Sequence, residues 1–285
     1  MIRQLIFLIV LLITLVVFAY SVRQYFRYFK FTKKHPLGNI GRRIWITIKV
    51  AFLQEKILRR PVVGLMHALV WWGFIVILFG SVEMVIDGLF GTEKIFFSLG
   101  SVYSFFMASG DLFGLIITLA ILAFLFRRLF MHVKRFYGPE MKPVSKADAN
   151  LALTIILVLM ISLLGMNTFY VAWSTRVGGE VLGVYPVSQY LAGFFKNMTP
   201  AESQLLYQIN WWTHIVLIFI FANILPYSKH FHVFMSVPNV FVSKIKPLGY
   251  IENMDSITRE VKLMLDPLAA VSATSVDEDE PERFG

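Results

Sequence analysis

Five long apolar runs, separated by polar and charged connections, organise the 285-residue chain. Each run has about 20 residues with few charges, which is the length that an α-helix needs to cross the ~30 Å hydrocarbon core of a bilayer. The hydropathy pattern therefore predicts five membrane-spanning helices. They are expected at Leu5–Tyr25, Val62–Ile86, Leu112–Phe130, Ala149–Trp173 and Ile209–Tyr227.

Composition supports the membrane interpretation. Hydrophobic residues make up 57% of the chain, and its mean hydropathy is +0.66. A soluble domain of this composition has more apolar side chain than its core can bury, so we predict an all-α integral membrane protein with a five-helix transmembrane bundle. The chain has no cysteine, which excludes disulfides, thiolate zinc sites and iron–sulfur ligands of its own. The first apolar run resembles a signal peptide but lacks a small-residue cleavage site, so we expect a retained helix.

The basic residues predict the orientation of the bundle. The four connections, counted with the ends of the flanking runs as residues 21–61, 83–111, 127–148 and 174–208, hold eleven, one, six and two Lys or Arg residues. This alternation follows the positive-inside rule, which puts the N-terminus outside and the C-terminus in the cytoplasm. The net charge of +9 therefore reflects membrane topology, and we expect no nucleic-acid partner.

The segments outside the runs divide the chain into two predicted domains. Residues 1–235 form the five-span membrane domain, and residues 236–285 form a cytoplasmic tail or linker with an acidic end. Within the first domain, Ile44–Leu58 is expected to lie along the inner interface as a helix, with a plain basic loop as the alternative. The aromatic segment Asp87–Gly110 either dips into the membrane or covers the bundle from outside.

The fifth run carries the most informative chemistry. Thr199, Pro200 and Glu202 form a predicted capping box at its start. His214 and His232 are 18 residues apart, which is five helical turns and roughly 27 Å along a straight helix. One helix would then present an imidazole toward each leaflet on the same face.

A histidine in the second run is expected to meet the inner one of these two. His67 follows Pro61 by six residues, so it lies about 9 Å into the second helix from the cytoplasmic side. His232 is expected at the cytoplasmic end of the fifth helix, at a similar depth. An iron porphyrin held between two helices needs one imidazole from each, so His67 and His232 are the predicted axial ligands of a haem b. The alternative is that each imidazole only binds a backbone carbonyl or the interface.

The other histidines have less defined roles. His214 faces the outer leaflet and is a candidate ligand of a second haem, with Met84 or Met166 as possible sixth ligands. His230 is a candidate for contact with a haem propionate or a quinone, or for iron ligation if the helix unwinds beyond Pro226. His132 is expected either at a propionate or in an interfacial basic cluster, and His35 is expected to be solvated.

Other chemistries find little support in the sequence. It shows no glycine-rich phosphate loop, no nucleophile elbow and no paired carboxylates inside the membrane. A transporter would be expected to show inverted repeats or helices broken near the bilayer midplane.

The histidine pattern resembles the gamma subunit of respiratory nitrate reductase. Five spans, a histidine early in the second span and the segment LPYSKHFHVF are similar to that family. The resemblance implies that His232 and His214 are the two haem ligands on the last helix and that His67 is one of two on the second helix. The second of these falls on Ile77, which cannot bind iron. This chain therefore departs from the family at one ligand of the outer haem.

A closer resemblance is to membrane iron–sulfur oxidoreductases related to heterodisulfide reductase. RRPVVGLMHALVWWGF and LPYSKHFHVFMSVPNVF are similar to their signatures. In that family a cysteine-rich domain with [4Fe–4S] clusters follows a haem domain of this kind, so the clusters are expected in a partner or a following domain.

Together these observations predict a b-type cytochrome of the bacterial cytoplasmic membrane. It would transfer electrons between a cytoplasmic, cysteine-rich iron–sulfur oxidoreductase and menaquinone, within the lipid bilayer. The predicted iron ligands are His67, His232 and His214, with His230 as a further cofactor contact. A haem-free anchor of a redox complex and a small transporter are the alternatives.

Overall fold

The computed structural model describes residues 1–31, 37–131, 133, 142–246, 249–251 and 253–265. All regular secondary structure in these residues is helical. The chain divides into two compact units, Met1–Val242 and Ser243–Gly285, and each is described by itself. The predicted all-helical class is confirmed.

Five helices of the first unit are long and apolar enough to cross a membrane, as predicted. They are α1 (Ile2–Phe29), α4 (Pro61–Phe90), α5 (Ser101–Leu129), α6 (Pro143–Arg176) and α8 (Pro200–Ile224). Pro occupies the first turn of α4, α6 and α8, where a missing N–H costs nothing. The predicted capping box of α8 is confirmed, because Thr199 and Glu202 each accept a hydrogen bond from the other's backbone N–H.

The connections contain shorter helices. The first holds α2 (Ile40–Thr47), a π-helical turn (Ile48–Phe52) and α3 (Glu55–Leu58). This is a broken helix rather than the single one expected, because Gln54 takes a left-handed conformation with φ 58°. α5 begins at Ser101, before the predicted Leu112, and so includes part of the aromatic outer segment. α7 (Pro186–Ala192) lies in the fourth connection.

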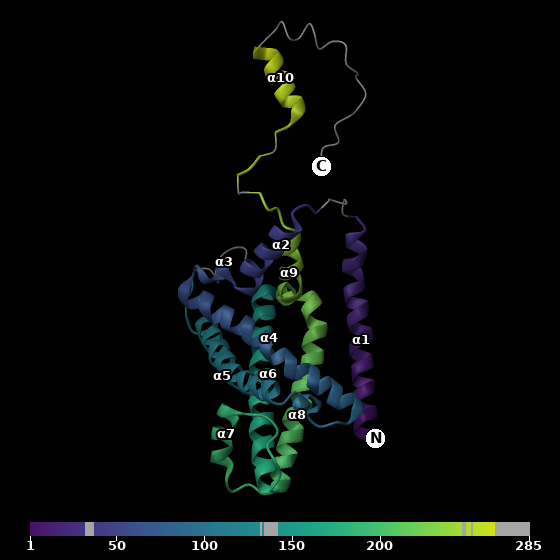
Figure 1. Cartoon of the computed structure of the whole chain (residues 1–285), viewed down its shortest axis with the longest axis vertical. Helices are drawn as coiled ribbons and strands as arrows, with labels where there is room; N and C mark the ends of the chain where they lie inside the picture. Colours follow the sequence, from purple (N-terminus) through teal and green to yellow (C-terminus); the bar gives the residue numbers. More distant parts are fainter. Residues whose placement is uncertain (32–36, 132, 134–141, 247–248, 252, 266–285) are drawn as a thin grey trace. The chain divides into compact units, whose positions relative to one another are not determined.

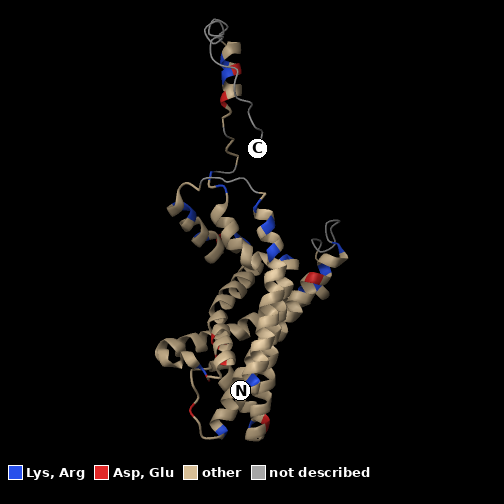
Figure 2. Cartoon of the chain, turned by 90° about the vertical axis from the view of Figure 1, so that its right-hand side faces the viewer, with Lys and Arg blue, Asp and Glu red and all other residues tan. Residues whose placement is uncertain are grey.

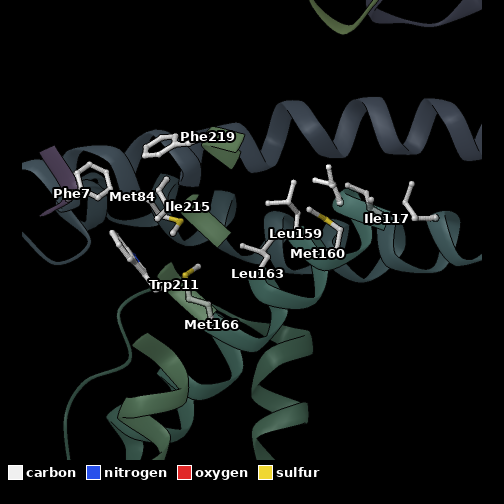
Figure 3. Packing of buried hydrophobic residues seen from close by; sticks show 12 residues of the cluster. Phe7, Met84, Ile117, Leu159, Met160, Leu163, Met166, Trp211, Ile215 and Phe219 are labelled. Carbon is white, nitrogen blue, oxygen red and sulfur yellow. The ribbon is translucent and has the colours of Figure 1, made fainter. Parts of the chain in front are cut away.

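The long helices pack as an antiparallel bundle. α6 packs most extensively against α8, α5 lies between α4 and α6, and α1 contacts both α4 and α8 (Figure 1). The largest buried apolar cluster joins all five of these helices through side chains that include Phe7, Met84, Ile117, Leu163 and Trp211 (Figure 3). We call the end of the bundle where α4 begins the α9 end, and the end where α4 finishes the α7 end.

Charged residues are mostly absent from the middle of the spanning helices and lie near their ends (Figure 2). The described Lys and Arg residues of the first connection, including Arg42, Arg43, Arg59 and Arg60, all lie at the α9 end. This distribution is the one that the positive-inside rule uses. The orientation of the termini stays a prediction.

The fifth span is not one straight helix. α8 ends at Ile224, and a 3-10 turn (Leu225–Tyr227) leads to Ser228, whose backbone is extended. A second 3-10 turn (Lys229–Phe231) follows, and α9 (His232–Val242) begins at His232. The prediction that His214 and His232 share one continuous helix is therefore wrong. Pro226 cannot donate a backbone hydrogen bond to the preceding turn, which favours the break at this place.

The second unit contains α10 (Asp255–Leu265), a short helix with a charged side and a row of exposed apolar residues. The acidic end of the tail lies outside the described residues. The division between the units falls after Val242, at the end of α9, and α9 itself runs across residue 235.

Candidate functional site

Two histidine rings from different helices meet at the α9 end of the bundle. His67 lies in the second turn of α4, and His232 is the first residue of α9. Their ring centroids are 6.3 Å apart, with 32° between the ring planes. The break in the fifth span does not separate them, because α9 starts at the level where α4 begins. The sequence placed both rings at this depth, and the structure brings them together.

This pair passes a test of fit to an iron porphyrin. Two imidazoles that bind one metal from opposite sides, each with a nitrogen ~2 Å from it, have ring centres roughly 6 Å apart. Nδ1 of His232 lies 3.1 Å from the carbonyl oxygen of Lys229, to which it can donate, so that Nε2 keeps its lone pair. Nδ1 of His67 is buried and has no hydrogen-bond partner. The geometry and the donor set therefore fit a bis-imidazole haem.

His230 lies beside the pair. Its ring centroid is 6.0 Å from that of His232, and its Nδ1 is 2.9 Å from the hydroxyl of Ser228. Burial lowers the pKa of His230 below its usual value, although nearby Asp148 opposes this effect. A neutral imidazole here can serve as ligand or hydrogen-bond partner. Since the chain does unwind beyond Pro226, the condition for His230 as an alternative ligand is met.

α1 holds the broken segment in place. The hydroxyl of Tyr25 donates to the carbonyl of Pro226, and its ring stacks on Phe231 with centroids 4.7 Å apart. The hydroxyl of Tyr227 donates to Ser21, whose side chain is buried in α1. These contacts lie on either side of the break, so the position of His232 depends on α1. Sequence patterns gave no sign of this role.

Two further candidates of the sequence analysis lie beyond the described residues. His35 and His132 belong to segments that the structure does not describe, so their predicted solvation and propionate contact stay predictions. Among the described residues, no group of three or more His, Asp or Glu side chains is arranged to hold a metal ion. An iron site at the α9 end would therefore depend on a porphyrin for its remaining ligands.

A cavity opens at the α7 end of the bundle. It is lined by residues of α4, α5, α6 and α8 and by Lys94 in the connection between α4 and α5. Its polar side chains include Glu83, Lys94 and His214, and its apolar wall includes Ile77. Mostly apolar cavities with a few convergent polar groups are typical ligand sites. Its first lining residue on α4, Val76, lies nine residues beyond His67, about 14 Å along the helix.

His214 is fully buried at the edge of this cavity. Its Nδ1 lies 2.9 Å from the carbonyl oxygen of Leu159 and 3.0 Å from the hydroxyl of Ser162. Donation to the carbonyl puts the proton on Nδ1 and leaves a lone pair on Nε2. Met84 and Met166, the predicted sixth ligands, line the same cavity as His214 and Ile77. The structure thus gathers the residues of the predicted outer site, and its ligand stays a prediction.

Lys94 contributes a positive charge to the cavity. Its ammonium group lies 2.7 Å from the hydroxyl of Tyr185 and 4.3 Å from the ring centre of Tyr170. Burial raises the pKa of Tyr185 above its ordinary value, so this phenol stays protonated and donates to the carbonyl of Leu182. Tyr185 and Tyr170 therefore hold the Lys94 ammonium at the wall of the cavity, where it also interacts electrostatically with Glu83.

Two carboxylates inside the spanning helices correct the sequence analysis. Glu83 of α4 and Asp111 of α5 were assigned to the outer connection, yet both are buried and line the cavity. Glu83 accepts hydrogen bonds from Phe96 N–H and Tyr103 hydroxyl. An acidic residue within an apolar run was the available signal, because ionisable groups in spans are rare and usually functional.

Asp111 has a structural task at this end. Its carboxylate accepts hydrogen bonds from the N–H groups of Val187 and Ser188 at 2.8 and 2.9 Å, and from the Ser188 hydroxyl. The side-chain amide of Asn167 donates to it at 3.1 Å. Asp111 thereby fastens α7 to α5 and α6 at this end of the bundle.

Two proteins of known name are similar to this chain. The "Probable iron-sulfur-binding oxidoreductase FadF" of Bacillus subtilis (strain 168) is 27% identical over 274 residues, covering 91% of this chain and 35% of the relative. The "EtfAB:quinone oxidoreductase" of Syntrophomonas wolfei subsp. wolfei is 23% identical over 225 residues, covering 75% and 29%.

The chain spans about a third of the length of these relatives. Their names agree with the resemblance to membrane iron–sulfur oxidoreductases, and nothing in the comparisons bears on the nitrate reductase gamma subunit. No family model matches the chain, and no solved structure matches it.

Proposed function

We propose that this chain is the membrane domain of a quinone-linked iron–sulfur oxidoreductase and that it is a b-type cytochrome. It transfers electrons between a cytoplasmic iron–sulfur protein or domain and menaquinone in a bacterial cytoplasmic membrane. The observation that carries the proposal is the 6.3 Å separation of the His67 and His232 rings, which come from two different helices. The names of the two relatives support the iron–sulfur and quinone partners.

His67 and His232 are the residues that would hold haem b. Each would donate the Nε2 lone pair to iron from one side, and the Lys229 carbonyl would keep His232 in the required tautomer. Bound haem supplies reversible one-electron transfer. The chain's own contribution is to hold the two rings at the required separation, to exclude water with α1 and α4, and to set the polarity around them.

The cavity at the α7 end is our proposed quinone site. A quinone headgroup needs hydrogen-bond donors for its carbonyl oxygens, and the Lys94 ammonium supplies one. His214 Nε2 supplies an acceptor for the hydroxyl of the reduced form, because Nδ1 carries the ring proton. The apolar wall around Ile77, Met84 and Met166 suits the ring and its isoprenoid tail.

The alternative for this cavity is the second haem that the sequence analysis considered. His214 with Met84 or Met166 would then bind iron, and the quinone would bind elsewhere. A haem count separates these possibilities. We propose one haem, because Ile77 provides no ligand opposite His214 and the cavity's polar groups suit a quinone.

The test is the haem stoichiometry of the purified full chain in detergent, measured as pyridine haemochrome. We expect one b-type haem per chain, reducible by a water-soluble menaquinol analogue. Two haems per chain would show that the cavity holds iron porphyrin instead of quinone. A folded chain expressed with ample haem but containing none would overturn the proposal in favour of a haem-free anchor.

A further inference from the structure

Unpaired polar atoms occur on α4 and on the connection that precedes it, at the α9 end. In the part of the chain that the structure describes, five buried side-chain polar atoms lack a hydrogen bond. Three of them are Gln54 Oε1, His67 Nδ1 and Trp71 Nε1. Buried polar groups are normally paired, so such a group of exceptions needs an explanation.

The packing of the first connection against α4 shows how these atoms are placed. At one point a Cβ on Gly64 would overlap the carbonyl oxygen of Ile57, so the two backbones touch there. Further along α4, the Trp71 ring lies 6.4 Å from that of Phe52, and the Trp72 indole donates to the Phe52 carbonyl at 2.8 Å. The connection therefore runs along α4 in the opposite direction.

His67 lies between these two contact points. Gly64, His67 and Trp71 are three and seven residues apart, so they share one face of α4. The stretch that faces them runs from Ile57 back to Phe52, and Gln54 lies within it. Gln54 thus lies between the two contact points on the connection, as His67 does on α4.

Gln54 is held tightly and has one acceptor left. It is 6% exposed, and its backbone has a left-handed φ of 58°, which is uncommon for a residue other than glycine. Its side-chain amide N–H donates to the carbonyl of Ala51, which leaves Oε1 as an acceptor with two lone pairs. His67 Nδ1 and Trp71 Nε1 are the two unpaired donors on the facing helix.

We propose that Gln54 positions His67, with its Oε1 accepting a hydrogen bond from the Nδ1–H of the imidazole. This bond keeps the proton on Nδ1 and the lone pair on Nε2, which is the tautomer that iron ligation needs. The second lone pair of Oε1 is available to Trp71 Nε1–H. Metal-binding histidines almost always donate their second ring N–H to such an acceptor, which raises the basicity of the ligand. The inference rests on the proposed haem site and adds a positioning residue to it.

The charge of the acceptor at position 54 then influences the midpoint potential of the iron. An anionic acceptor pulls the Nδ1 proton and makes Nε2 a stronger donor, which favours the oxidised iron and lowers the midpoint potential. Removal of the acceptor has the opposite effect on the potential and weakens haem retention by roughly tenfold or more. If Gln54 only packed against α4, an anionic replacement and an apolar replacement would not shift the midpoint potential in opposite directions.

The experiment compares Gln54→Glu, Gln54→Leu and, as a control, Gln204→Leu, since Gln204 is exposed on α8. Each full-length variant is purified in detergent, and its haem content and midpoint potential are measured by optical redox titration. We expect a lower potential in Gln54→Glu, and a higher potential with less haem in Gln54→Leu. Wild-type potentials in both variants would overturn the inference. The isosteric Glu variant keeps the test readable if the Leu variant does not fold.

A second measurement does not depend on haem. In ¹⁵N-histidine-labelled apoprotein, the His67 ring shifts report its tautomer, and the His67→Gln spectrum assigns them. We expect the Nδ1–H tautomer in the wild type and a mixture in Gln54→Leu. An unchanged tautomer would overturn the inference, whereas a chain that binds no haem yet shows the expected change would overturn only the proposed function.

Discussion

The ring of Tyr25 on α1 stacks on that of Phe231, the residue that precedes His232, with centroids 4.7 Å apart. The Tyr25 hydroxyl also reaches the carbonyl of Pro226 on the other side of the helix break. α1 is otherwise largely exposed along its length, which in a membrane means contact with lipid. Its contact with the broken segment gives the first spanning helix a specific role in the site.

Loss of this contact is expected to loosen the inner histidine pair. Tyr25→Ala removes a stacked aromatic pair and a hydrogen bond, which together contribute about 1–3 kcal/mol. We expect a several-fold lower haem content and a broader reduced α-band. Tyr25→Phe keeps the stacked ring, so its haem content should lie between that of Tyr25→Ala and that of the wild type. Tyr20→Ala on the same helix is the matched control, since Tyr20 is exposed. Wild-type haem content in Tyr25→Ala would show that α1 does not hold His232.

Removal of either ring of the inner pair is expected to abolish haem b. In His67→Ala or His232→Ala one axial ligand is lost, and the pyridine haemochrome should fall close to background. His230→Ala should keep most of the haem, because the pair is complete without it. His35→Ala is the control from a loop that the sequence predicts to be solvated. If His230→Ala loses the haem and His232→Ala retains it, His230 is the ligand.

The pattern of the sequence predicted the spanning helices and the proximity of the His67 and His232 rings. Apolar run length predicts the five spans, because an unpaired backbone cannot cross hydrocarbon and helices satisfy it internally. The depths of His67 and His232 followed from counting residues from the helix ends. The two rings meet although the fifth span is broken, because α9 begins at His232 directly after the second 3-10 turn.

The polar lining of the outer cavity was not predicted. Averaged hydropathy placed Glu83 and Asp111 at the two ends of the predicted second connection, although α4 and α5 extend past these residues. Their partners, such as Ser188 of α7 and Tyr103 of α5, are distant in sequence and leave no local pattern. Tertiary hydrogen bonding of this kind becomes visible only when the helices are placed together.

Lys94 provides a test of the proposed quinone site. Lys94→Met keeps much of the side-chain length and removes the charge that would bind a quinone carbonyl. A charge-assisted hydrogen bond contributes about 1.5–3 kcal/mol. We therefore expect KM for a menaquinol analogue to rise by one to two orders of magnitude, with the haem content unchanged. Lys196→Met, at an exposed lysine in the same outer part of the chain, is the control. An unchanged KM would place the quinone elsewhere.

Asp111 provides a test of how the outer end is assembled. Asp111→Asn keeps the shape of the side chain but replaces one acceptor oxygen by an NH₂ group. Donors at Val187, Ser188 and Asn167 converge on this carboxylate, so at least one N–H or O–H would then face another donor. A buried group left unpaired costs about 1–3 kcal/mol, and the charge-assisted bonds to the others weaken as well.

We expect Asp111→Asn to lower the thermal stability of the purified chain and to expose the connection around α7 to limited proteolysis. The haem at the α9 end should be retained at normal stoichiometry, because His67 and His232 lie at the opposite end of the bundle. Asp255→Asn in the second unit is the matched control, since Asp255 is exposed at the start of α10. Proteolysis of the α7 connection at the wild-type rate would show that α7 is held mainly by its apolar contacts, and that Asp111 has another role in the cavity.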